Sequence, residues 1–350
     1  MAKNDLKLFA GGSSANIITQ AEYEAMASLI NGFSTGVAQS RQLNKVWRQA
    51  SFISAMIGQF TMHNALDDVL DDGDVDGFEE KFRMGLQNLF PKLQQNGVIL
   101  FVRTDGSDSN DGSDNTGAKA FRTIAAAIDY ATSRFYITDG TLTIQIGVPG
   151  SYSAPGIVSG SLAKIRIIGD AANQANYIIS GVGPAAGQSG LISAEGSQVS
   201  LEGLTINNTG SINSGVGASG SGSSMGLNNV TVTTTGTGSF ANVFTVAGGN
   251  LVIGAGCIFK GNATAMLSAQ SGAISISANF NVDGGTYSVV ASATTGGSIQ
   301  VTMTGLSITG SCSGTRYYAT LNGVINTSGA GTNFFPGTAA GQIDRGGQYA

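Results

Sequence analysis

Charged side chains are scarce in this sequence: they make up 11% of its 350 residues, against about a quarter in an ordinary soluble domain. Glycine, by contrast, occurs 52 times. Low charge with much glycine often indicates disorder, but here the apolar residues recur with the spacing of strands. The sequence therefore predicts an ordered, turn-rich β-protein. Its net charge of −5 argues against nucleic acid as the main partner, because phosphate binding requires a basic face.

Cysteine and long apolar runs are also scarce. The two cysteines, Cys257 and Cys312, are too few for a disulfide scaffold and lack the spacing of zinc ligands. Each lies in a strand-like run, which predicts two small buried side chains. No stretch approaches the roughly 18 apolar residues of a membrane span, and the N-terminus shows no apolar core of a signal peptide. We therefore expect synthesis in a cytoplasm without a cleavable signal, and no membrane insertion.

Residues 1–97 have helical patterns. Thr19 and Glu22 form a capping box that opens a helix to about Ile30, and further helices begin at Ser40 and near Asp76. The helix from Ser40 has an apolar stripe that is too wide for a free-standing pair of helices, so we expect copies of the chain to bury it. The stripe consists of Leu43, Val46, Trp47, Ala50, Ile53, Ala55, Met56, Ile57 and Phe60.

The remaining sequence repeats at intervals of roughly 23–25 residues with three short strands in each, the dimensions of a solenoid coil. Equivalent strands begin at Gln198, Asn250, Ala273, Ser298 and Gly323, and we place Val230 to Val232 in the long interval after the first. This pattern predicts a mainly β fold, a right-handed parallel β-helix over residues 98–330, ahead of a β-sandwich or a β-prism. Residues 98–135 supply its opening strand, loop and helix, residues 210–224 read as a loop or linker, and residues 331–350 form a tail.

Two segments resemble the start of pectate-lyase-like β-helix domains. Residues 102–112, VRTDGSDSNDG, match the strand and the Gly/Asp/Asn loop of that start. Residues 121–128, FRTIAAAI, match the "F-x-T-I-x-x-A" run that follows it. The resemblance implies a helix that lies over the end of the solenoid.

The termini resemble those of tail fibres and tailspikes of tailed bacteriophages. At the N-terminus, residues 10–16, 20–24 and 48–51 are similar to the head-attachment module of these proteins. At the C-terminus, residues 333–337 (NFFPG) and 346–350 (GGQYA) are similar to their endings. The resemblance implies a homotrimer in the virion tail, attached through its N-terminal region to tail or baseplate proteins. Its β-helix would point toward a host surface glycan or another fibre subunit.

Acidic residues are too few to favour an enzyme. Between residues 151 and 350 the acids are Asp170, Glu195, Glu202, Asp283 and Asp344. Glycoside hydrolysis requires two carboxylates about 5–10 Å apart, and Glu195 with Glu202 is the best pair. Lys164 and Arg166 share one strand face, but no obvious partner completes a lyase site. We therefore expect a structural or adhesive protein. The alternatives are a depolymerase with an intersubunit site that uses Glu195, Glu202 or Asp283, and a connector that binds no host molecule.

No metal or cofactor is expected. Asp72, Asp74 and Asp76 match the first half of an EF-hand loop, but Arg83 stands where the bidentate glutamate belongs. Capping of a helix N-terminus explains these acids better. The acids of residues 104–119 alternate with Gly, Ser and Asn, a pattern typical of Asx-turns.

Overall fold

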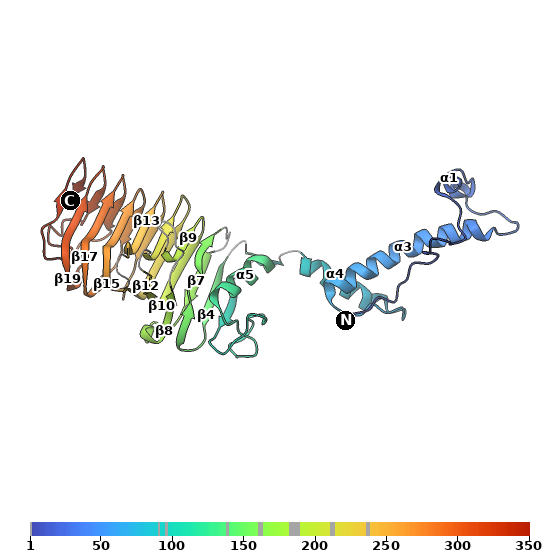
Figure 1. The fold of residues 1–350 in the computed structure, drawn as a ribbon, viewed down its shortest axis with the longest axis horizontal. Helices are drawn as coiled ribbons and strands as arrows, with labels where there is room; N and C mark the ends of the chain where they lie inside the picture. Colours follow the sequence, from blue (N-terminus) through green and yellow to red (C-terminus); the bar gives the residue numbers. More distant parts are fainter. Residues whose placement is uncertain are drawn as a thin grey trace. The chain divides into compact units, whose positions relative to one another are not determined.

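The computed structural model describes residues 2–89, 92–94, 97–137, 140–159, 164–181, 190–210, 214–235 and 239–350. The chain divides into two compact units, Met1–Lys92 and Leu93–Ala350 (Figure 1). Across these residues, no helix combines the length and the apolar character that a membrane crossing demands.

The described part of the N-terminal unit contains the helices α1 (Gln20–Glu24), α2 (Ser28–Asn31), α3 (Ser40–Ala65) and α4 (Val75–Leu89). The predicted start at Ser40 is confirmed, as is the capping box between Thr19 and Glu22. The prediction of one helix from the capping box to Ile30 is wrong, because the helix ends at Glu24 and a separate helix, α2, begins at Ser28. Ile30 is 89% exposed, so no packing stabilises a continuous helix at this point.

The extended segment before α1 runs alongside α3. The Asn4 amide donates to the Ala55 carbonyl at 3.2 Å, and farther along the Asn44 amide donates to the Asn16 carbonyl at 2.9 Å. A Cβ atom on Gly58 would lie 2.5 Å from the Asn4 side-chain oxygen. Glycine at this position therefore allows the segment to lie directly on one face of α3.

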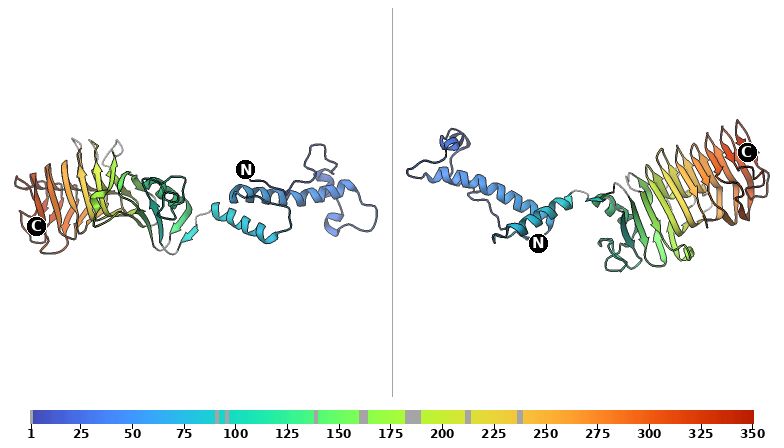
Figure 2. Two further views of the ribbon diagram at one scale, coloured as in Figure 1. Left: turned by 90° about the horizontal axis from the view of Figure 1, so that it is seen from below. Right: turned by 180° about the vertical axis from the view of Figure 1, so that it is seen from behind.

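The second unit is a parallel β-solenoid in which each full coil passes through three strand ladders, A, B and C (Figures 1 and 2). Ladder A stacks β2 (Val98–Val102), β4 (Thr141–Ile146), β7 (Lys164–Ile168), the first parts of β10 (Gln198–Asn208) and β12 (Ser224–Thr234), β14 (Asn250–Ile253), β16 (Ala273–Ile276), β18 (Ser298–Val301), β20 (Val324–Asn326) and β22 (Gln348–Tyr349).

Ladder B stacks β5 (Gly150–Ser153), β8 (Tyr177–Gly181), the second parts of β10 and β12, and the first parts of β15 (Ile258–Gln270), β17 (Phe280–Thr294) and β19 (Ile308–Ala319). Ladder C stacks β6 (Gly156–Ser159), β9 (Gly190–Glu195), β11 (Ser214–Ser219), β13 (Ala241–Val246), the second parts of β15, β17 and β19, and β21 (Gln342–Ile343). Outside the ladders lie the β1 (Lys92–Gln94) and β3 (Phe135–Ile137) pair and the short helix η1 (Gln174–Asn176).

Alternation along ladder A turns two columns of apolar side chains into the core. One column is Leu142, Ile165, Val199, Met225, Leu251, Ile274, Ile299 and Ile325, and the other is Leu100, Ile144, Ile167, Leu201, Leu227, Ile253, Ile276 and Val301. All are buried. A single coil cannot bury such residues, whereas stacked coils share them. The parallel pairing confirms a β-solenoid and rules out the sandwich, whose sheets are antiparallel.

Two details of the predicted repeat are wrong. Ser298 pairs with Val324 and not with the predicted Gly323, so the last interval is one residue longer than predicted. The strand between those of Val199 and Leu251 is the start of β12, whereas Val230 to Val232 lies in ladder B. The glycine between Met225 and Leu227 weakens the apolar pattern of the true equivalent, which explains the error.

The prediction of a loop or linker over residues 210–224 is also wrong. Strand β11 crosses this range in ladder C, and Val216 and Ala218 are fully buried. Small residues are required here for packing, because a Cβ atom on Gly217 would overlap the Phe244 ring. Residues 211–213 lie outside the described residues.

Helix α5 (Ile124–Arg134) packs against the opening strands of the solenoid, with Ile124, Ala127 and Ala131 in the core. It begins at Ile124 because the Thr123 hydroxyl caps it, accepting the N–H of Ala126 at 3.2 Å. Just before it, the buried Phe121 bridges Val102 of β2.

The pairing of the ladders continues beyond residue 330, into the predicted tail. Strand β21 pairs with β19, and β22 pairs with β20. Phe335 is fully buried in the same core, and the ring of Tyr349 stacks on Tyr317 at a centroid distance of 3.8 Å. Residues 331–350 therefore extend the ladders and the core of the solenoid rather than forming a separate tail.

Candidate functional site

The best carboxylate pair of the sequence, Glu195 and Glu202, is separated by a strand of ladder A. Glu195 ends β9 in ladder C, and Glu202 lies where ladder A leads into ladder B. At roughly 3.3 Å per residue, the stretch from Gln198 to Glu202 alone spans about 13 Å. The backbone positions of the two acids are therefore separated by a full strand, and Glu202 is already ion-paired with Arg166, which disfavours Glu195 and Glu202 as a catalytic pair within one chain.

Asp283 lies several coils away from Glu202, on the outer face of ladder B. Its coil is the third after that of Glu202, which corresponds to about 14 Å of stacked strands. The carboxylate lies 3.8 Å from the Lys260 ammonium. The structure therefore brings none of the three candidate acids together.

A shallow groove on ladder A is lined by Lys164, one of the two cations that the sequence left without a partner. Lys164 pairs in register with Gln198, and Arg166 pairs with Ser200 and forms an ion pair with Glu202. The groove has a volume of about 260 Å³ and crosses β7, β10, β12 and β14. Sequence spacing did not reveal it, because Lys164 and Gln198 are separated by more than one repeat of the sequence.

The acids of residues 104–119 bond to the chain around them. Arg103 holds Asp105 through two hydrogen bonds of 2.9 and 3.0 Å, which lowers the pKa of that carboxyl. Asp108 accepts the backbone N–H groups of Arg122 and Thr123 at 3.0 and 2.8 Å. Asp111 accepts from Ser113, which lowers the pKa of Asp111. These bonds are those of turns and a helix start.

The EF-hand-like run behaves as the start of α4. Asp72 accepts the N–H of Asp74 at 3.0 Å, and Asp74 accepts the N–H of Gly77 at 2.9 Å. Within the described ranges, no group of three His, Cys, Asp or Glu side chains is placed to hold a metal ion.

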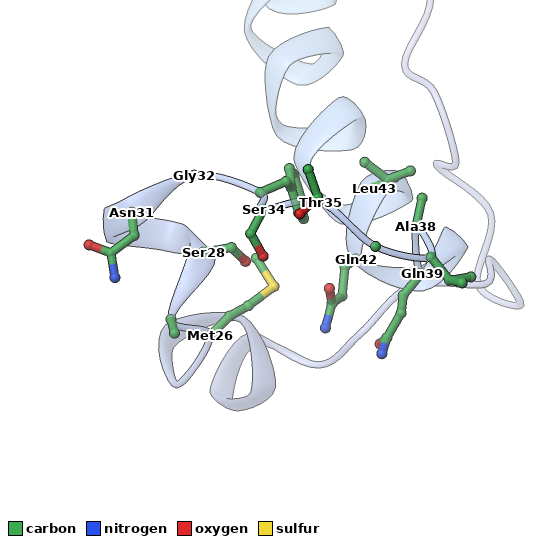
Figure 3. Close-up of a pocket in the computed structure, with 14 residues that line it drawn as sticks. Met26, Ser28, Asn31, Gly32, Ser34, Thr35, Ala38, Gln39, Gln42 and Leu43 are labelled. Atoms are coloured by element: carbon green, nitrogen blue, oxygen red, sulfur yellow. The ribbon is translucent and has the colours of Figure 1, made fainter.

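A hollow in the N-terminal unit lies between α2, the following loop and the start of α3 (Figure 3). Its volume is about 790 Å³. Side chains such as Met26, Ser34, Gln39 and Gln42 line it, and none of the lining residues that the structure describes is ionisable. These residues therefore offer no acid, base or charged ligand-binding group.

Neither cysteine is expected to react in the folded protein. Burial raises the pKa of both the Cys257 and the Cys312 thiol to about 11, so little thiolate is present at pH 8. We expect dithiobis-nitrobenzoate to label neither thiol in the native state and both in guanidinium chloride. Rapid labelling of one native thiol at pH 8 would contradict the burial described above.

A comparison of the chain with protein-family models, with curated proteins and with solved structures finds no match. The resemblance to phage fibres therefore stays a prediction that depends on the terminal segments quoted above.

Proposed function

We propose that this chain is a homotrimeric tail fibre or tailspike of a tailed bacteriophage, adhesive rather than enzymatic. Its N-terminal unit attaches to tail or baseplate proteins. Its solenoid, right-handed as nearly all parallel crossovers are, presents its surface to the host or to another fibre subunit. The observation that carries this proposal is an apolar seam on α3 that its own chain leaves partly open.

The seam follows a heptad pattern. Leu43, Val46, Ala50, Ile53 and Ile57 are spaced alternately three and four residues apart, and Phe60 continues the series. This is the a/d spacing by which α-helices wrap around one another as a coiled coil. A heptad seam is complementary to copies of itself, so a second and a third copy of the chain are its natural partners.

Helix α4 covers only the C-terminal end of the seam. The rings of Phe60 and Phe82 lie 5.7 Å apart, and the Asn88 amide donates to the Asn64 carbonyl at 2.8 Å. Toward the N-terminus the apolar side chains stay accessible, and Ile53 is 52% exposed. Such exposure in a single chain is typical of an interface.

The identity of the seam residues favours three strands over two. In parallel dimers the d positions prefer leucine, whereas β-branched residues at d shift the preference to higher oligomers. With Leu43 at position a, Val46 and Ile53 occupy d. The flanking positions hold Trp47, Gln49 and other uncharged residues, so parallel copies meet no like charges across the seam.

The composition of the solenoid supports adhesion over catalysis. Between residues 203 and 315 the only charged residues are Lys260 and Asp283, and they lie close together. The rest of this surface is built mainly from Ser, Thr, Asn and Gly. The alternative, a depolymerase, requires that a neighbouring subunit supply a second carboxylate to Glu195, Glu202 or Asp283.

Two assays on phage particles that contain this chain, and one on the purified protein, test the proposal. An antibody raised against the solenoid should label the tail, and particles without the chain should adsorb poorly. Purified trimer incubated with the host polysaccharide should release no new reducing ends or unsaturated products. Cleavage that is lost in Glu195→Gln or Glu202→Gln would establish the depolymerase instead, and normal adsorption without residues 98–350 would establish the connector.

A further inference from the structure

The groove on ladder A is a depression in the outer face of the solenoid that has a charged residue, Lys164, in its lining. Its floor is Gly226, which carries no side chain, between Ser200 of the preceding coil and Val252 of the following coil. Val252 is 43% exposed and forms an apolar wall. Strand alternation also points Gln198 and Ser224 outward, so an amide and two hydroxyls surround the floor.

Lys164 lies at one end of this groove and is exposed. Arg166, two residues on, is neutralised by Glu202, whereas Lys164 forms no ion pair with any described residue. The ammonium group is thus available to an anionic ligand. Among the described residues that line the groove there is no carboxylate, so none of them opposes negative charge.

We infer that this groove binds one carboxylate-bearing sugar unit, such as a hexuronic acid within a longer glycan. Lys164 pairs with the carboxylate, since hydrogen bonds between ionised groups are the strong ones in a wet site. Ser200, Ser224 and Gln198 bond the ring hydroxyls, and the C–H face of the ring lies on Gly226 and Val252. A volume of about 260 Å³ is below the roughly 300–1,000 Å³ of drug-sized pockets, which suits a single ring.

This inference rests on the proposed function, in which the solenoid surface meets a host glycan. The two fail separately. A monomeric chain would overturn the trimeric fibre without touching the groove, and a trimer that ignores acidic sugars would overturn the groove alone.

The test is calorimetric titration of the full chain with trigalacturonic acid, and with maltotriose as the neutral match. We expect saturable binding of the acid and binding about two- to fivefold weaker for maltotriose, because the ion pair with the exposed Lys164 is lost. Lys164→Ala should weaken acid binding by a similar factor.

Gly226→Leu should abolish binding by filling the groove. A Cβ atom there lies 3.6 Å from that of Ser200, an ordinary contact, so the strand tolerates the change. Ser275→Leu adds the same bulk to the same column one coil beyond Val252 and should bind like the parent. The inference is overturned if the parent binds neither sugar or both equally, or if Gly226→Leu binds as the parent does.

Discussion

Phe335→Ala is expected to lower the free energy of unfolding of the solenoid by about 3–5 kcal/mol, the usual cost of emptying a large aromatic site in a core. Phe335 is completely buried, and its ring lies 5.0 Å from that of Phe334. Both rings belong to the same cluster as the columns of ladder A.

Chemical denaturation followed by circular dichroism measures this effect. Phe335→Leu keeps most of the volume and should cost less than about 1.5 kcal/mol. Phe52→Ala, at a phenylalanine that is 57% exposed on α3, serves as the control for the solenoid transition and should leave it unchanged. A Phe335→Ala protein as stable as the parent would mean that residues 331–350 do not pack on the core.

Ile53→Asp is expected to convert the proposed trimer to monomers at micromolar concentration. Ile53 lies at the centre of the open part of the seam, so a trimer would bury three carboxylates side by side. Unpaired buried charges cost several kcal/mol each. The exposed position of Ile53 in the single chain means that the monomer itself should still fold.

Sedimentation or light scattering of the variant checks this prediction. Gln59→Asp introduces the same charge on the same helix, at an exposed residue outside the seam, and should leave the trimer intact. A trimeric Ile53→Asp protein would place the subunit interface elsewhere in the chain.

The sequence predicted the solenoid well because its physics is local and repeated. Apolar residues two apart, followed by glycine turns, recur often enough to indicate stacked coils. The helices α3 and α4 could also be predicted from the sequence, since Ser40 and the acids before α4 mark their starts. These elements depend on short-range patterns that a single chain displays directly.

Register and sites were harder to predict, because they depend on contacts between coils. The sequence around Gly217 is typical of a linker, but the Phe244 ring of the next coil occupies the space that a side chain at this position would need. Likewise Arg166 finds Glu202, and Lys164 meets Gln198, across a long and irregular coil. The separation of Glu195 from Glu202 follows from the length of the strand between them, although the sequence places both in one coil.

The central claim is that the chain forms a trimer through its N-terminal helices, and the mass of the full chain in solution tests it most directly. Light scattering coupled to size exclusion should give three times the chain mass of 35.4 kDa at micromolar concentration. A mass of 35.4 kDa under the same conditions would contradict the trimeric fibre.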